Sequence, residues 1–162
     1  MGRQRATGTP ATATLQEAGV PHTLHSYAHD PRAESFGLQA ASALGVEPAR
    51  VYKTLLVDTG DSLAVGVVPV TCSLDLKAMA LALGAKKVGM ANPASAERSS
   101  GMVVGGISPI GQKRPLPTVL DHTMHEHATV LVSGGRRGLD VELAPSDLAR
   151  LTGATFASIS RP

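Results

Sequence analysis

The chain of 162 residues contains no tryptophan, only two phenylalanines and two tyrosines, and a single cysteine. With so few aromatic rings, a surface on which successive nucleic acid bases stack is nearly excluded, and any contact with RNA would be mostly to phosphate. The hydrophobic residues, 43% of the chain, must therefore build the core mainly from alanine, valine, leucine and isoleucine.

The lone cysteine, Cys72, cannot form an internal disulfide, which fits a reducing compartment. We interpret it as structural, because no base or basic cluster stands beside it. No apolar run approaches the roughly 20 residues of a membrane-spanning helix, and the start MGRQRATGTP lacks the apolar segment of a secretory signal. We expect a soluble cytoplasmic protein without membrane contact, folded as one domain over residues 1–162, with residues 1–8 flexible.

Familiar catalytic signatures are missing as well. There is no P-loop, nucleotide fingerprint, serine-hydrolase elbow or paired-carboxylate motif. Histidines gather in HTMHEH at residues 122–127, and His25 and His29 stand four apart, but no set of cysteines or carboxylates completes a recognised ligand spacing. We expect neither a metal nor a cofactor.

The formal net charge of +2 is too small to mark a general polyanion binder. The basic residues nevertheless form three doublets, each within two residues after a glycine: Lys86-Lys87, Lys113-Arg114 and Arg136-Arg137. Glycine favours turns, so the doublets are expected in loops or at strand edges. A merely solvated surface is the alternative for each of them.

Helices are predicted where apolar residues recur at helical spacing between caps, over residues 10–21, 34–48, 74–84, 92–101 and 144–153. Ser73 is expected to cap the third of these helices. Strands are predicted over 22–31, in a hairpin at 51–70, and over 101–109, 118–121, 128–135, 139–143 and 154–160. The pattern neither repeats nor alternates simply, so we expect a mixed α/β fold, with a partly barrel-like mixed sheet surrounded by helices.

Three polar residues on predicted strands are candidates for chemistry. Lys53 shares a strand face with Val51, Leu55 and Val57, so it either faces inward and needs an anion or snorkels to solvent. Ser133 lies where a strand meets the turn GGRRG, a place where serine usually forms turns. Asp140 alternates with apolar residues, and periodicity alone puts it on an exposed polar face.

The segment GGISPIGQKRPLP, residues 105–117, combines three glycines and three prolines with a basic pair, which predicts a loop. Together with YAHDP, VYKTLLV and VSGGRRGLDVEL, in that order, it resembles the YbaK family of aminoacyl-tRNA deacylases. These are Cys-tRNA(Pro) hydrolases related to the editing domain of bacterial prolyl-tRNA synthetases. The likeness runs from about Thr14 to about Ser160. It implies the same mixed, partly barrel-like fold and a trans-editing enzyme that cleaves the ester of mischarged tRNA.

The resemblance also implies the residues of the site. Its catalytic positions fall on Lys53, Gly105, Ser133 and Asp140, and its substrate-binding positions on Tyr27, Gly106, Ile107, Ser108, Lys113 and Arg114. Lys53 would hold a phosphate or the substrate end, and Lys113-Arg114 would face acceptor-stem phosphates. The resemblance implies no protein nucleophile, because the thiol of the substrate's own cysteine attacks the ester carbonyl.

Substrate and partner stay open at this level. The resemblance favours Cys-tRNA(Pro) as the substrate, whereas related deacylases act on tRNAs charged with alanine, serine or other amino acids. A synthetase such as prolyl-tRNA synthetase could supply the tRNA specificity that a weakly basic protein lacks. The alternative to an enzyme is a non-catalytic module that binds tRNA ends or small adenylated ligands.

Overall fold

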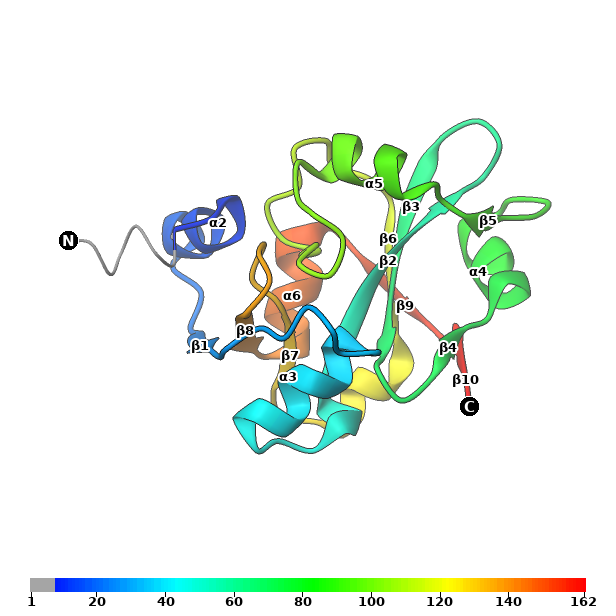
Figure 1. Ribbon diagram of the computed structural model, residues 1–162. Coiled ribbons are helices and arrows are strands. Elements are labelled where there is room, and N and C mark those ends of the chain that lie inside the picture. The colour runs from blue at the N-terminus through cyan, green and yellow to red at the C-terminus, as the bar shows by residue number, and fades with distance from the viewer. Residues whose placement is uncertain (1–7) are drawn as a thin grey trace.

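The structure is a computed structural model that describes residues 8–162, and Figure 1 shows its elements in chain order. They are α2 (Pro10–Ala18), β1 (Thr23–Ser26), α3 (Phe36–Leu44), η1 (Pro48–Arg50), β2 (Tyr52–Asp58), β3 (Leu63–Pro69), β4 (Ser73–Leu74), α4 (Leu76–Leu83), β5 (Gly89–Met90), α5 (Pro93–Ser100), β6 (Thr118–Asp121), η2 (His122–Glu126), β7 (Val130–Ser133), β8 (Leu139–Leu143), α6 (Pro145–Thr152), β9 (Thr155–Ala157) and β10 (Ser160–Arg161). None of the helices in this range is both long and apolar enough to cross a membrane.

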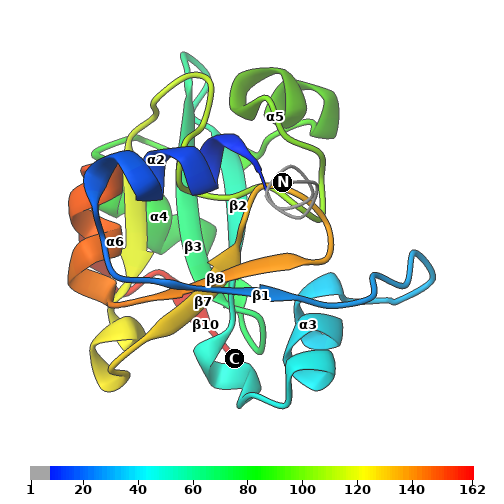
Figure 2. The ribbon, with the colours of Figure 1, turned by 90° about the vertical axis from the view of Figure 1, so that its left-hand side faces the viewer.

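The strands form two main sheets and one small pair. The larger sheet has the order β5-β2-β3-β6-β9, in which β2 and β3 are an antiparallel hairpin while β6 runs parallel to both β3 and β9. The smaller sheet, β1-β8-β7, is antiparallel, and Figure 2 shows its strands running across those of the larger sheet. Strands β4 and β10 form the pair. The mixed α/β class is confirmed, although no sheet of the described residues closes into a barrel.

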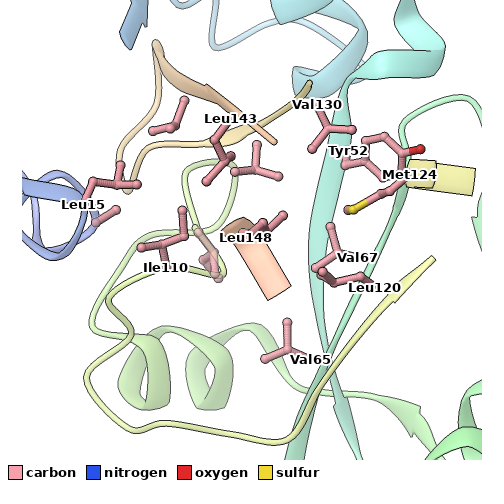
Figure 3. Close-up of a cluster of buried hydrophobic side chains, with 14 of the residues drawn as sticks. Leu15, Tyr52, Val65, Val67, Ile110, Leu120, Met124, Val130, Leu143 and Leu148 are labelled. Carbon is pink, nitrogen blue, oxygen red and sulfur yellow. The ribbon is translucent and has the colours of Figure 1, made fainter. Parts of the chain in front are cut away.

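The larger sheet buries both faces because its strands alternate residues between two apolar clusters. On β3, Val65 and Val67 face the cluster between the two sheets, whereas Ala64 and Val68 face the cluster covered by α4. Figure 3 shows the first cluster, which also receives Leu15 from α2, Leu148 from α6 and several side chains of β7 and β8. This packing fixes the two sheets against each other and so holds β2 beside β7 and β8.

Most of the predicted helices form where the sequence places them, and their ends follow the expected chemistry. Helix α2 begins after Thr9, whose side chain accepts a hydrogen bond from the backbone of Thr12, and it ends at Gly19 with φ of +65°. Helix α4 differs from the prediction, because its capping side chain is that of Asp75. Ser73 instead lies in β4 and pairs with Arg161, a partner far away in the sequence.

The strand predicted over residues 101–109 is wrong. The segment forms turns, in which the N–H of Gly106 donates to the carbonyl of Val103. The Val104 backbone is bound by side chains: its N–H donates to Glu97, and its carbonyl accepts two hydrogen bonds from Arg137. Side chains thus take the backbone groups that a neighbouring strand would have used.

Two domain-level predictions stay as they were. The segment expected to be flexible, residues 1–8, falls almost wholly on residues 1–7, which lie outside the described residues. The interpretation of residues 1–162 as one domain remains a prediction.

Candidate active site

A cavity of about 340 Å³ lies at the edge of β2, between the two sheets, helix α3 and the loop that precedes β6. A cavity of this size matches the small end of ligand-binding sites in proteins. Its wall is mostly apolar, with a few polar side chains from separate elements. It is lined by Tyr27, Ser35, Phe36, Gly37, Ala40, Val51, Tyr52, Lys53, Thr54, Leu55, Leu56, Met90, Ala91, Pro93, Ala96, Val104, Gly105, Ile107, Ser133 and Asp140.

The cavity lies beside a gap along one side of β2, between the bridge of Val51 with Leu131 of β7 and strand β5, which pairs only with Val57 and Asp58. Backbone groups of an antiparallel strand alternate between its two sides. The Val51 carbonyl accepts from Val70 on the β3 side, whereas the Leu56 carbonyl accepts from Ala91 on the other. The backbone groups of Thr54 therefore point to the open side. The Thr54 hydroxyl is also buried without a hydrogen bond among the described residues.

Lys53 lies in the wall that β2 contributes to the cavity. It shares its strand face with Leu55 and Val57 and is half-buried. Within residues 8–162 no ion pair or hydrogen bond holds its ammonium group. A partly desolvated cation beside a cavity favours an anionic ligand.

Asp140 lies on β8 between Ser133 of β7 and His25 of β1, each directly opposite it in the strand register. It is only 5% exposed, so its predicted place on an exposed face is wrong. His25 and Ser133 flank Asp140 on that face from the two neighbouring strands, and β1 is more than a hundred residues away in the sequence. Burial raises the pKa of Asp140 to about 7, an effect that the charge of His25 partly opposes.

Tyr27 lines the cavity just after β1 ends. Its backbone N–H donates to the carbonyl of Gly138, which fixes the chain beside the turn before β8. Burial and then the neighbouring Asp140 raise the pKa of Tyr27 to about 12. The phenol therefore stays protonated at neutral pH and can donate a hydrogen bond into the cavity.

Gly105 brings the loop of residues 101–117 to the cavity mouth. Its φ of +91° lies in the left-handed region, and a Cβ there would lie 2.5 Å from Cδ2 of Phe36. Arg137 holds this arrangement in place: it donates to the Val104 carbonyl at 2.9 and 2.7 Å, and its guanidinium lies 5.4 Å from the centre of the Phe36 ring. Arg137, one residue of the doublet Arg136-Arg137, is thus hydrogen-bonded within the protein.

The structure brings six of the ten residues predicted for the site into one cavity and leaves four outside its lining. The six are Tyr27, Lys53, Gly105, Ile107, Ser133 and Asp140. Gly106 packs against the backbone of Arg136 and Arg137, where a Cβ would be 2.6 Å away. Ser108 is fully buried, and its hydroxyl accepts a hydrogen bond from the N–H of Ile110. Lys113 and Arg114 are exposed on the loop that follows α5.

Several lining residues carried no signal in the sequence. Phe36 fits the apolar spacing of α3, and Thr54 is one more polar residue on a strand. Met90 and Val104 reach the mouth from short, irregular segments and are among the exposed large hydrophobic residues. Only the contact between distant loops reveals them.

The histidines and the cysteine lie outside the cavity lining. Among residues 8–162, no three histidine, cysteine or acidic side chains gather closely enough to hold a metal ion. His25 binds Glu142, with 2.8 Å between Nε2 and Oε1, and His125 packs on the ring of Phe156. Cys72 is a half-buried free thiol beside Thr71.

The cavity offers charge and backbone groups but no nucleophile with a base. Within residues 8–162 no histidine or lysine forms a hydrogen bond with Ser133, whose hydroxyl accepts one from the N–H of Gly135. The lining includes neither histidine nor cysteine. The charges of this lining are complementary to a small ligand with both a cationic and an anionic group, and chemistry there requires a nucleophile from the substrate or from water.

This combination of fold and cavity is that of an editing domain. The family model of the aminoacyl-tRNA editing domain matches residues 31–151, and the chain belongs to this family. EbsC of Enterococcus faecalis, a proposed Cys-tRNA(Pro)/Cys-tRNA(Cys) deacylase, is 36% identical over 156 residues, which cover 94% of this chain and 93% of that protein.

Two crystal structures are similar over 94% of the chain. A proposed trans-editing enzyme for prolyl-tRNA synthetase is covered to 96%, with a TM-score of 0.80 and 24% identity, which shows a shared fold. The hypothetical protein APE2540 is covered completely, with a TM-score of 0.82 and 25% identity.

Proposed function

We propose that this protein is a trans-acting deacylase that removes the amino acid from mischarged tRNA, with Cys-tRNA(Pro) as its substrate. The observation that carries this proposal is the meeting of Lys53 and Asp140 in one apolar cavity without a protein nucleophile. An aminoacyl-adenosine has the complementary groups, an α-ammonium near its ester and phosphates beyond the ribose. Membership of the editing-domain family supports the same substrate class.

Each lining group has a role that follows from its position. Asp140 accepts the α-ammonium group, and the hydroxyls of Ser133 and Tyr27 help to orient it. Lys53 binds a phosphate of the terminal nucleotides. Gly105 lets the ester carbonyl approach the backbone closely, so that N–H groups of the loop stabilise the developing oxyanion.

The chemistry relies on the substrate's thiol. The thiolate sulfur attacks the ester carbonyl carbon, the C–S bond forms, and the bond from that carbon to the ribose oxygen breaks. The ribose oxygen takes the proton that the thiol released, and the products are free tRNA and a cyclic thioester that water opens in solution. A hydroxyl in place of the thiol is far less ionised near neutral pH, so a serine ester reacts slowly.

A panel of mischarged tRNAs tests the proposal. Loss of the ester is measured over time for tRNA(Pro) charged with cysteine, serine or alanine, with the Cys72→Ala variant beside the parent protein. We expect fast loss of cysteine only, and full activity in Cys72→Ala. Binding without ester loss would identify a non-catalytic module. Equal rates for cysteine and serine would replace the thiol mechanism by attack of a bound water.

The name of the E. faecalis relative includes Cys-tRNA(Cys), which raises the question of tRNA choice. Four aromatic side chains in the whole chain give little means of reading bases. We expect this protein to deacylate Cys-tRNA(Cys) as well when alone, and prolyl-tRNA synthetase to confer selectivity as a partner. Adding the synthetase to the assay should then raise the preference for Cys-tRNA(Pro).

The exposed pair Lys113-Arg114 is proposed to contact phosphates of the acceptor stem. Changing both residues to glutamate should weaken tRNA binding most at low salt and flatten its salt dependence. With fewer phosphate contacts, binding releases fewer counterions from the tRNA. The matched control is the same change at Lys86-Lys87, a doublet outside the cavity lining. Equal effects of the two double variants would leave only a general contribution of net charge.

A further inference from the structure

His25 is the neighbour of Asp140 in the sheet, although it does not line the cavity. It lies on β1 directly opposite Asp140 of β8 in an antiparallel pair. Residues paired in this way project to the same face of the sheet, with Cβ atoms about 4.5–5.5 Å apart. His25 is absent from the cavity lining, whereas Asp140 belongs to it. The imidazole is therefore a neighbour of Asp140 on the sheet that does not itself line the cavity.

The orientation of His25 is fixed by a second carboxylate, Glu142. His25 Nε2 lies 2.8 Å from Glu142 Oε1, while Arg50 donates to Glu142 Oε2 at 2.9 Å. The hydroxyl of Thr129 also donates to Glu142, and the Arg50 guanidinium returns to Thr129 at 2.7 Å. Glu142 is thus held from three sides, and it holds the imidazole on the face that carries Asp140.

Asp140 has no comparable support. Its carboxylate receives no hydrogen bond from any side chain or backbone group of the described residues, although it is almost fully buried. The groups that can influence its charge come from β1, β2, η1 and its own strand. They are His25, Tyr27, Tyr52, Lys53, Arg50 and Glu142. Arg50 is bound to Glu142, the two tyrosines are neutral at pH 7, and Lys53 lines the same cavity from β2.

We propose that His25 is a positioning residue whose positive charge, oriented by Glu142, keeps Asp140 ionised so that it can receive the substrate's ammonium group. This inference rests on the proposed function. Without the imidazolium charge, a buried and unsupported carboxyl holds its proton to higher pH. A protonated Asp140 can no longer balance the ammonium group, and the substrate binds in an unproductive way.

The test replaces His25 by glutamine, whose amide can still donate to Glu142 but carries no charge. Single-turnover deacylation of Cys-tRNA(Pro) is measured from pH 5.5 to 8.5, with spontaneous ester hydrolysis subtracted. We expect the acidic limb of the His25→Gln profile to lie roughly one pH unit higher, with a rate several-fold lower at pH 6.5 and close to that of the parent at pH 8.5. The substrate thiol ionises equally in both assays, so its contribution cancels in the ratio.

His22→Gln is the matched control, because His22 precedes β1 and bonds through Nδ1 to the Val20 carbonyl. It should leave the profile unchanged. Carbon-13 NMR of the Asp140 carboxyl in the free protein gives a readout that needs no substrate. An unchanged Asp140 titration in His25→Gln would overturn the inference. A shifted titration with an unchanged rate profile would instead remove Asp140 from the proposed mechanism, and an inactive parent protein would refute the proposed function.

Discussion

Two aspartates are almost fully buried in the described residues, and their surroundings are opposite. Asp121, at the end of β6, is fully buried and accepts hydrogen bonds from Ile159, Ser160 and Thr123. Asp140 is 5% exposed and accepts none. Burial alone would raise the pKa of Asp121, but its hydrogen bonds outweigh burial and lower it, whereas burial raises the pKa of Asp140 to about 7. A buried carboxylate whose hydrogen bonds are made within the protein stabilises the fold, whereas one without such bonds is a candidate for binding a ligand.

The positions of the two residues agree with this distinction. Asp121 ties the C-terminal segment to the larger sheet and, through Thr123, reaches the hydroxyl of Tyr52. Asp140 shares its cavity with Lys53, a cation that also lacks a partner among residues 8–162. The fold therefore places two potentially complementary side chains in the wall of one cavity without pairing them with each other.

The largest effect is expected from Lys53→Ala, which should lower deacylation by at least about 1,000-fold. Lys53 carries no internal hydrogen bond or ion pair, so the free energy of unfolding should change by less than about 1 kcal/mol. Activity and urea denaturation are measured together, with the exposed Lys77→Ala as control. A variant that loses stability as well as activity would show that Lys53, like Asp121, stabilises the fold.

Asp140→Asn should lower the deacylation rate by about 100-fold, because a neutral amide cannot balance the substrate's ammonium group. Its melting temperature at pH 8 should stay level or rise, since no internal hydrogen bond is lost and a buried charge is removed. Deacylation rates and thermal unfolding are compared with those of the parent. An active variant would contradict the role proposed for this carboxylate.

Asp121→Asn should do the reverse and destabilise the fold by about 2–3 kcal/mol while leaving the activity of folded molecules near normal. The amide keeps one acceptor oxygen, but its NH₂ group meets donors that the carboxylate had accepted. Urea denaturation gives the change, and the rate is normalised to the folded fraction. If activity per folded molecule also falls sharply, the link from Asp121 through Thr123 to Tyr52 shapes the cavity.

The same comparison shows what the sequence can predict. The hairpin of β2 and β3 and the helices α2, α3 and α6 follow from local periodicity and caps, and they form as expected. Periodicity puts Asp140 on an exposed face, because a local pattern does not show that β1, from a distant part of the sequence, pairs with β8 and places His25 beside Asp140. Residues 101–109 are rich in β-forming side chains, yet Glu97 and Arg137 bind the backbone of Val104 and leave no strand there.

Part of the candidate site could likewise be found without a structure. The family resemblance points to Lys53, Gly105, Ser133 and Asp140, which do meet in one cavity. Phe36, Thr54 and the pair of Arg137 with Val104 could not be found, because their importance depends on which distant segments touch. Loop 101–117 and the turn before β8 meet through the bond of Arg137 to Val104, two residues that are 33 positions apart in the sequence.

The smallest effect concerns the pH dependence of stability, in which the two aspartates have opposite signs. The pKa of Asp140 is raised from 3.8 to about 7, so between these values the folded protein holds a proton that the unfolded chain has released. Its contribution therefore falls as the pH rises from about 4 to 7. The pKa of Asp121 is lowered, so its contribution to stability is present above the ordinary pKa of aspartate and is lost only as the solution becomes more acidic.

Urea denaturation at pH 5 and pH 8 separates the contributions of the two aspartates. Relative to the parent, Asp140→Asn should gain about 1–2 kcal/mol of unfolding free energy between pH 5 and pH 8, whereas the deficit of Asp121→Asn should be nearly the same at both. A deficit in Asp121→Asn that grows across this range, or a parent and an Asp140→Asn variant with parallel pH profiles, would mean that hydrogen bonding does not distinguish the two carboxylates.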